Sequence, residues 1–223
     1  DCQRLVNQDR NIYGSCMLAV GDADALVSGV TRSYTATYDD VRRVIDAKPG
    51  KRVFGLSMVL ARGRTVFVAD TTVHELPTSV EMADIAVQTA EVARRLGHEP
   101  RVAMLSFSNF GNPGWDTANR VREAVSMMDS RITDFEYDGE MSADVALNPD
   151  LRELYPFSRL SGPANVLIMP ALHSANISSK LLQELGGGTV IGPILVGLTK
   201  AVQIAAMGTS VSDLVNMAAL AAH

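Results

Sequence analysis

The stretch TSVEMADIAVQTAEVARRLGHEPRVAMLSF, residues 78–107, contains the clearest helix and the clearest strand of the chain, in that order. Thr78 and Glu81 have the spacing of a capping box, and apolar side chains then recur every three or four residues. Gly97 is typical of a helix C-terminus. Residues 101–107 form an apolar run of the kind found in buried parallel strands. A helix that leads into a buried strand predicts an α/β protein.

The same alternation of strands and helices continues on both sides of this stretch. Towards the N-terminus, a strand-like run at residues 25–29 precedes a helical pattern at residues 38–47 and a β-hairpin that turns at Arg62-Gly63. Towards the C-terminus, the pattern predicts helices around residues 117–128, 177–185 and 211–222 and strands at residues 135–137, 165–169 and 190–196. Alternation at this length indicates an α/β fold, with largely parallel sheets flanked by helices.

The composition excludes several classes of protein. Hydrophobic residues make up 47% and charged residues 20% of the 223 residues, which is ordinary for a globular domain and too apolar for a disordered chain. The formal net charge of −5 makes nucleic acid and anionic membrane surfaces poor partners. No apolar run reaches the roughly 18 residues of a membrane span. Two cysteines without metal-ligand spacing suit a reducing compartment, so we expect a cytoplasmic protein.

Three glycine-containing turns follow predicted strands and are candidate ligand sites. They lie at residues 27–32, 106–111 and 138–140. Ligands of open α/β sheets bind where strands end, and backbone N–H groups in such turns can hold a phosphate or a carbonyl oxygen. None of the three matches a P-loop or a G-x-G-x-x-G fingerprint, so each is by itself better explained as a plain βα turn.

Other polar and aromatic residues also have both a functional and a structural explanation. Arg42 and Arg43 are consistent with an anion clamp or with a solvated helix face. Asp138, Glu140 and Asp144 form an acidic cluster without histidine support, so a turn and a helix start explain them better and no metal is expected. Trp115 lies in a glycine-rich loop, where we expect it to pack rather than to stack on a ligand.

Five motifs resemble those of the phosphate acetyltransferase family. In chain order they are DADALVSG (residues 22–29), VAMLSFS (102–108), YDGE (137–140), GPANVLIMP (162–170) and GPILVGL (192–198). They occur in the family's order and cover nearly the whole chain. The opening residues 1–11 and residues 213–220, DLVNMAAL, are most similar to the phosphotransacetylase-like C-terminal domain of hybrid NADP-dependent malic enzymes. Because the chain opens on Asp1 rather than Met, we expect a piece of a longer protein.

The resemblance implies a two-lobed fold like that of isocitrate dehydrogenase. The first lobe comprises residues 1–52 and 199–223, lacks its N-terminal part and is completed by the C-terminal helix. The second lobe, residues 53–198, mediates formation of a homodimer or a higher homo-oligomer. Apolar residues at 53–68 and 78–96 are the expected dimer surface. The cleft between the lobes is expected to bind CoA or acetyl-CoA, with no covalently bound cofactor.

The resemblance also identifies where the catalytic residues of the family belong. Active relatives have a Ser-Arg pair before the last helix, followed by a glycine and an aspartate. Ala206 and Met207 stand at the Ser-Arg pair, and Asp213 stands at the aspartate. In the family the serine stabilises the transition state, the arginine engages acetyl phosphate, and the aspartate is proposed to take the CoA thiol proton. Asp213 also has capping-box spacing from Ser210, which is an alternative explanation for it.

The remaining candidate residues concern ligand binding rather than catalysis. Arg42 matches a family arginine implicated in CoA binding. Ser28, Gly29 and Thr31, in the turn after the first predicted strand, and Asp213 are the other expected ligand contacts.

Three functions are compatible with this pattern. The first is a regulatory domain that binds acetyl-CoA and inhibits an upstream malic-enzyme domain, which converts malate to pyruvate and CO2 and which would hold the NADP and the divalent metal. The second is an active phosphate acetyltransferase, which makes acetyl phosphate and CoA from acetyl-CoA and phosphate. The third is a purely structural dimerisation module. The absence of the Ser-Arg pair favours the first over the second, because an arginine facing an anion is worth about 10²–10³-fold in rate.

Overall fold

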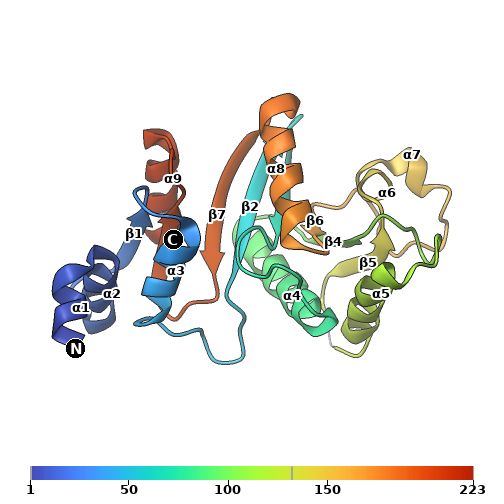
Figure 1. Ribbon diagram of the computed structural model, residues 1–223. Helices are drawn as coiled ribbons and strands as arrows, with labels where there is room; N and C mark the ends of the chain where they lie inside the picture. The colour runs from blue at the N-terminus through green and yellow to red at the C-terminus, as the bar shows by residue number, and fades with distance from the viewer. Residues whose placement is uncertain (1, 132, 223) are drawn as a thin grey trace. The chain divides into compact units, whose positions relative to one another are not determined.

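The computed structural model describes residues 2–131 and 133–222 and separates into two compact units (Figure 1). The first unit contains the chain up to Gly55 and again from Ile191 onward, and the second unit contains Leu56–Val190. These boundaries lie close to the lobe boundaries expected from the sequence. The main difference is that residues 191–198 belong to the first unit.

The first unit is built around two parallel strands, β1 (Ala25–Gly29) and β8 (Ala201–Ala205). Their helical neighbours are α2 and α3, which pack against each other and against the strands, and α9, which packs against both strands. The helices of this unit are α1 (Cys2–Gln8), α2 (Arg10–Val20), α3 (Tyr34–Arg42) and α9 (Val211–Ala222). Since Gly29 pairs with Ala205 in the parallel register, the carboxyl ends of both strands lie side by side. The strand β7 (Thr189–Val196) leads the chain back into this unit.

The second unit contains a mixed sheet in which the strands follow the order β5-β4-β6-β3-β2. These strands are β2 (Phe54–Ala61), β3 (Arg64–Ala69), β4 (Arg101–Leu105), β5 (Glu136–Met141) and β6 (Val166–Ile168). The strands β3, β6, β4 and β5 run parallel, and β2 is antiparallel to β3. The helices are α4 (Ser79–Arg95), α5 (Asp116–Asp129), α6 (Ala143–Leu147), α7 (Pro149–Arg152) and α8 (Leu172–Gly186).

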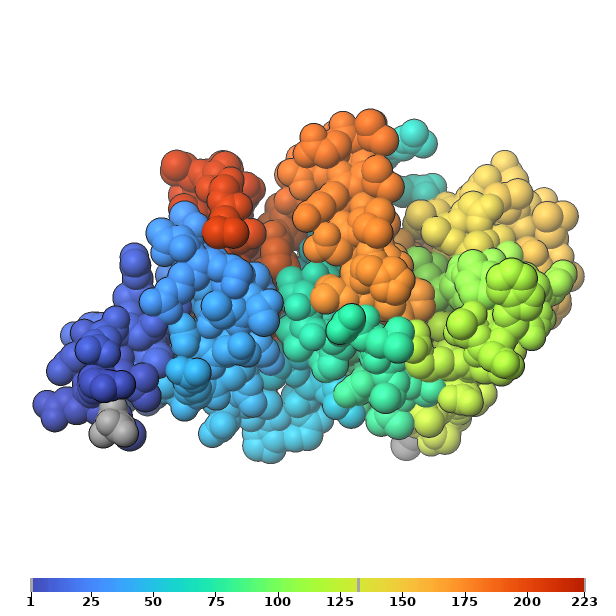
Figure 2. All heavy atoms as spheres, viewed as in Figure 1, coloured from blue at the N-terminus to red at the C-terminus, as the bar shows by residue number. Residues whose placement is uncertain are grey.

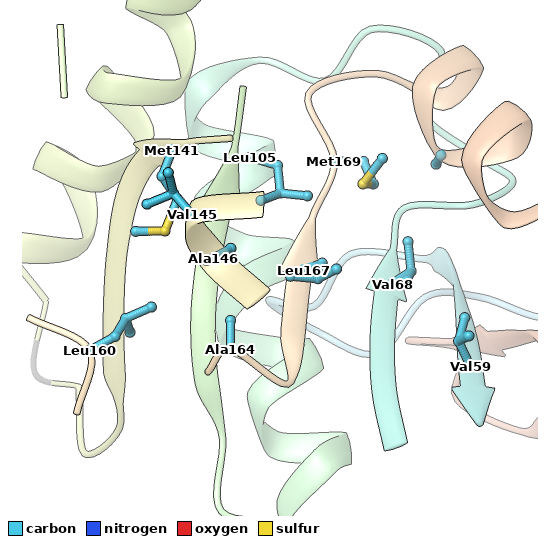
Figure 3. Close-up of a cluster of buried hydrophobic side chains, with 12 residues drawn as sticks. Val59, Val68, Leu105, Met141, Val145, Ala146, Leu160, Ala164, Leu167 and Met169 are labelled. Atoms are coloured by element: carbon cyan, nitrogen blue, oxygen red, sulfur yellow. The ribbon is translucent and has the colours of Figure 1, made fainter. Parts of the chain in front are cut away.

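Alternate side chains of these strands face the two layers of helices. On one face, α4 and α5 pack against each other and against the parallel strands. On the other face, one buried cluster contains Leu105 of β4, Leu167 of β6 and Val68 of β3 together with Val145 and Ala146 of α6 (Figure 3). Because successive strand residues point to opposite faces, the sheet is apolar on both sides, as the continuous apolar run in β4 predicts.

Most of the elements expected from the sequence are confirmed. The capping box of Thr78 and Glu81 begins α4, and the hairpin turns at Arg62 and Gly63. The helix expected at residues 38–47 is wrong at both ends: α3 begins at Tyr34, because the Ser33 side chain caps it, and ends at Arg42. The short helices α1, α6 and α7 and the strand β8 carry no strong local signal, and the sequence pattern does not predict them. None of the helices within residues 2–131 and 133–222 combines the length and hydrophobicity that crossing a bilayer requires.

The apolar face of α4 is used inside the second unit. Ten of its side chains are buried, among them Met82, Ile85 and Val92, and Val80 is the large apolar residue that stays exposed. In contrast to α4, the helix α8 has several apolar side chains exposed to solvent: Ala175 is buried, whereas Ile177, Leu181 and Leu185 are exposed. The part of the expected dimer surface at residues 78–96 therefore has its apolar residues occupied within the unit.

Candidate functional site

Two turns meet at the carboxyl edge of the β1-β8 pair in the first unit. One turn joins β1 to α3, and the other joins β8 to α9. The N–H of Val30 donates to the carbonyl oxygen of Ala205 at 3.1 Å, so the turns are directly hydrogen-bonded. Gly29 makes this approach possible: its φ is +109°, and a Cβ there would lie 2.1 Å from the Ala205 oxygen. This is the edge at which α/β sheets bind ligands.

Three of the expected ligand contacts lie in or beside the β1–α3 turn. Gly29 ends β1, and its carbonyl accepts the N–H of Thr31 at 2.8 Å, which tightens the turn. Thr31 is exposed. The hydroxyl of Ser28 donates to Asn11 Oδ1 at 2.7 Å, so it is positioned by α2.

The β8–α9 turn contains the positions of the family's Ser-Arg pair. Ala206 and Met207 are both exposed, and the Met207 side chain is 65% accessible. Two hydrogen bonds close the turn: the N–H and the hydroxyl of Thr209 both donate to the carbonyl of Ala206. Residues 206–210 contain no charged side chain. This turn presents a thioether and a methyl group at the sheet edge, so neither position supplies a hydrogen-bond donor or a positive charge from its side chain.

Asp213 takes part in the cap of α9. The Ser210 hydroxyl donates to Asp213 Oδ2 at 2.6 Å, and the same hydroxyl oxygen accepts the N–H of Asp213 at 3.2 Å. The bond from the Asp213 N–H to the Ser210 hydroxyl is one half of the capping box that the spacing predicts, and the bond from the Ser210 hydroxyl gives the Asp213 carboxylate a structural role. Its role as a base or ligand contact stays a prediction.

A polar network lies beneath the β1–α3 turn and joins it to two helices. Asn11 of α2 is buried and donates to Asp40 Oδ2 of α3 at 3.1 Å, while its own oxygen accepts the Ser28 hydroxyl. Arg32, three residues after Gly29, donates to the same Asp40 oxygen at 3.1 Å and also to Asp9. No single motif marks these residues, because they come from three separate segments of the chain.

The electrostatics of Asp9 follow from its neighbours. Partial burial by itself raises the pKa of Asp9, but the hydrogen bonds from Arg32 and from the N–H groups of Ile12 and Asn11 outweigh burial and hold it below its ordinary value. The hydrogen bond to Asp9 is the largest of the interactions that raise the pKa of the Arg32 guanidinium above its ordinary value. Both groups are therefore fully charged at neutral pH.

Arg42 lies away from the two turns. It is the last residue of α3, whose first residue follows the β1–α3 turn, so about 12 Å of helix separates them. Its guanidinium NH1 donates to the carbonyl of Ile45 at 2.6 Å. The structure brings Ser28, Gly29 and Thr31 close to Ala206 and Met207. Arg42 is not part of this group, so its contact with a ligand stays a prediction.

The acidic cluster expected to be structural consists of carboxylates with separate partners. Asp138 accepts the hydroxyl of Ser158 and the N–H of Arg159, whereas Asp144 accepts the hydroxyl of Ser142. Within the described part of the chain, no group of three or more His, Cys, Asp or Glu side chains has the arrangement of a metal site.

Residues 1–222 match the family described as phosphate acetyl/butaryl transferase. The chain belongs to this family. The resemblance of the five motifs to this family is confirmed. Phosphotransacetylases from Streptococcus pyogenes and Staphylococcus aureus have similar structures, with TM-scores of 0.89 and 0.83 at 35% and 33% identity. They cover 95% of this chain, which spans 66% and 67% of theirs.

Two kinds of curated relative match this phosphotransacetylase-like domain. The NADP-dependent malic enzyme of Rhizobium meliloti is 63% identical over the whole chain, which spans only 29% of that enzyme's length. The phosphate acetyltransferase of Bacillus subtilis is 35% identical over 96% of the chain, which spans 67% of its length. Domains similar to this one therefore occur both fused to malic enzymes and within phosphate acetyltransferases.

Proposed function

We propose that this domain binds acetyl-CoA and inhibits a malic enzyme in the same polypeptide, without transferring acetyl groups itself. The observation that supports this most directly is the β8–α9 turn, where Ala206 and Met207 stand at the positions of the Ser-Arg pair and residues 206–210 have no charge. An acetyl-phosphate-forming reaction places several negative charges at this position. Without an arginine there, the rate is expected to fall by about 10²–10³-fold for that contact alone.

Ligand binding makes smaller demands than catalysis. The β1–α3 turn keeps its close approach to β8 through Gly29, and the Asn11–Asp40–Arg32 network ties it to α2 and α3. Such preorganisation reduces the entropy lost on binding. Allosteric inhibition requires a coupling free energy of only about 1–3 kcal/mol, which changes an affinity by about 5–150-fold.

The relatives supply the second half of this proposal. A chain that is 63% identical to this domain over 29% of the length of an NADP-dependent malic enzyme supports a malic-enzyme part of the same polypeptide as the target of the proposed inhibition. NADP and the divalent metal would belong to the malic-enzyme part, which converts malate to pyruvate and CO2. We propose that acetyl-CoA binding and the malic-enzyme reaction both take place in the cytoplasm, because Cys2 and Cys16 are free thiols.

Two assays on the 223-residue domain test binding and transfer separately. We expect calorimetry to detect acetyl-CoA binding, and a thiol-release assay with acetyl-CoA and phosphate to detect no turnover. Arg42→Ala should weaken binding by about 1.5–3 kcal/mol if Arg42 contacts a ligand phosphate. Arg10→Ala is the control, because Arg10 is an exposed arginine of the same unit, at the start of α2. Turnover at roughly 1–10³ s⁻¹ would refute the regulatory proposal in favour of an acetyltransferase.

A third assay tests regulation in the full-length parent. Acetyl-CoA should inhibit malate-dependent NADPH formation, and the inhibition should disappear when this domain is deleted. If acetyl-CoA neither binds nor inhibits, the purely structural alternative is correct.

Self-association is a second proposed role, and α8 is the feature that favours it. Figure 2 shows α8, in orange, projecting from the visible surface of the second unit. Its exposed Ile177, Leu181 and Leu185 recur every four residues and form one apolar stripe. Beside it, a cavity of about 730 Å³ lies between α8, α6 and the β2–β3 hairpin, with Val59, Val66, Val68, Leu147 and Leu182 in its wall.

The occupant proposed for this cavity is the α8 stripe of a second copy. A two-fold dimer needs a surface that complements itself, and an apolar stripe beside an apolar cavity meets that condition. The charges agree: the cavity is lined by Arg62, Arg64 and Asp144, and α8 carries Glu184 and Lys180 one turn apart. In such a dimer, Glu184 of one copy can pair with the cavity arginines of the other copy, and Lys180 can pair with its Asp144.

A further inference from the structure

Two aromatic rings lie together and uncovered in the loop between β4 and α5. The ring centroids of Phe107 and Trp115 are 5.5 Å apart, and their planes are inclined by 53°. Phe107 is 52% and Trp115 is 67% exposed. Trp115, which the sequence predicts to pack rather than to stack on a ligand, has its ring against that of Phe107, and both rings are largely exposed.

The loop that carries these rings is fixed by Glu140. The β4–β5 pairing passes from Met104–Gly139 directly to Leu105–Met141, so Glu140 is the extra residue of a bulge. Its side chain is fully buried. Its Oε1 accepts the hydroxyl of Ser108, the N–H of Gly111 at 2.9 Å and a guanidinium N–H of Arg122 at 3.2 Å.

Further hydrogen bonds hold the middle of the same loop. The N–H of Phe110 donates to the Glu140 carbonyl at 2.9 Å, and Asn109 Oδ1 accepts the N–H of Ser142 at 2.7 Å. Exposed aromatic rings on a mobile loop would collapse onto the surface to bury apolar area. Here residues 108–111, which follow Phe107, are hydrogen-bonded to Glu140 and Ser142, and Trp115 directly precedes α5, so both rings extend from anchored backbone while they remain exposed.

The position of the ring pair on the sheet indicates a ligand. It follows the carboxyl end of β4, between two parallel neighbours in the sheet, and immediately precedes α5 (Figure 1). This is the edge at which α/β sheets bind their ligands. Inclined planes also leave each ring a face that the other does not cover, so a planar ligand can stack there.

We propose that Phe107 and Trp115 form a stacking site in the second unit for a planar heteroaromatic ring, specifically a nucleobase. The adenine of acetyl-CoA is the base that the proposed function supplies, so naming adenine rests on that function. Stacking of a base on an aromatic side chain changes affinity by about 5–150-fold per ring.

The test uses the fact that Trp115 is the only tryptophan of the 223 residues. Its fluorescence therefore reports this site alone. The domain is titrated with AMP, with acetyl-CoA and with acetyl-pantetheine, which lacks the base. We expect saturable quenching by AMP and acetyl-CoA, and no saturable change with acetyl-pantetheine.

Variants separate stacking from a general effect. Phe107→Ala should weaken AMP binding by about 5–150-fold, and Phe107→Tyr, which keeps the ring, should restore it. Tyr13→Ala is the matched control, since Tyr13 is 53% exposed on α2 in the other unit. Quenching that rises linearly, as it does for free N-acetyltryptophanamide, would overturn the inference. An unchanged affinity of Phe107→Ala for AMP would also overturn the inference. This holds equally if Phe107→Ala weakens contact with another protein domain instead.

The two proposals fail in distinguishable ways. If calorimetry detects acetyl-CoA binding while Trp115 fluorescence and Phe107→Ala show no effect, the stacking site is wrong and the proposed function stands. If AMP quenches Trp115 saturably but acetyl-CoA neither binds nor inhibits, the base site stands and the proposed function is wrong.

Discussion

Gly29 is the residue on which the ligand edge of the first unit depends. Its φ of +109° disfavours every other amino acid, and a Cβ would also collide with the Ala205 carbonyl at 2.1 Å. Gly29→Ala should therefore lower the free energy of unfolding by about 2–4 kcal/mol, from strain and steric overlap together. Denaturant titration measures this difference.

Gly50→Ala is the control for this substitution. Gly50 has a φ of +69°, but a Cβ added there would meet no other atom within 4 Å, so its replacement should cost about 1 kcal/mol. Equal costs at both glycines would mean that the contact between the two turns contributes nothing.

The absent Ser-Arg pair gives a second prediction at the scale of single residues. Ala206→Ser with Met207→Arg should create measurable sulfate or phosphate binding, because the guanidinium is a bidentate donor at an exposed turn. Thiol release should remain weak, since catalysis needs atoms held within about 0.5 Å by surrounding groups that these two changes do not rebuild. Val215→Arg, which adds the same charge at a 63% exposed position of α9, is the control. Full acetyltransferase rates in the double variant would contradict this prediction.

At the scale of elements, α2 is held to the β1–α3 turn by its N-cap. The Asp9 carboxylate accepts the N–H groups of Asn11 and Ile12 and also pairs with Arg32. Because the folded pKa of Asp9 is below its ordinary value of 3.8, its contribution to stability is complete at neutral pH. That contribution is lost as the pH falls below about 4, through the folded pKa.

Asp9→Asn isolates this charge, because asparagine is an equally good N-cap. We expect its thermal midpoint to be about 2–4 °C lower than that of the unmodified chain at pH 7, and the difference to shrink as the pH falls below 3.8 and through the lowered folded pKa of Asp9. Asp22→Asn, at an exposed position just after α2, should show no such pH-dependent difference. A difference that persists at low pH would mean that the charge of Asp9 is not its cause.

At the scale of the whole molecule, the exposed stripe of α8 predicts association. Equilibrium sedimentation at micromolar concentration should find a dimer or a larger species. Leu181→Glu, which places a charge in the middle of the stripe, should shift the chain towards monomer without unfolding it. Leu76→Glu, at a 61% exposed position outside α8, should leave the association unchanged. A monomer at all concentrations would contradict this role for α8.

The features that could be predicted from the sequence are local ones. The capping box of Thr78 and Glu81, the Arg62-Gly63 hairpin and the cap at Ser210 each depend on residues a few positions apart, and their hydrogen bonds form within one turn. The α/β class follows in the same way, because periods of about 3.6 and 2 residues are properties of single elements. The positions of Ala206 and Met207 come from resemblance, which preserves sequence order rather than geometry.

The features that required the tertiary structure depend on contacts between distant segments. The strand β8 has little pattern of its own and is recognised by its pairing with β1, from the opposite end of the sequence, at the register that sets Gly29 beside Ala205. The Asn11–Asp40 contact likewise exists only when α2 and α3 pack together. Trp115 shows why burial is not a local property: a large apolar ring is expected inside, but hydrogen bonds from the loop backbone to Glu140 decide where the loop runs and leave the ring exposed.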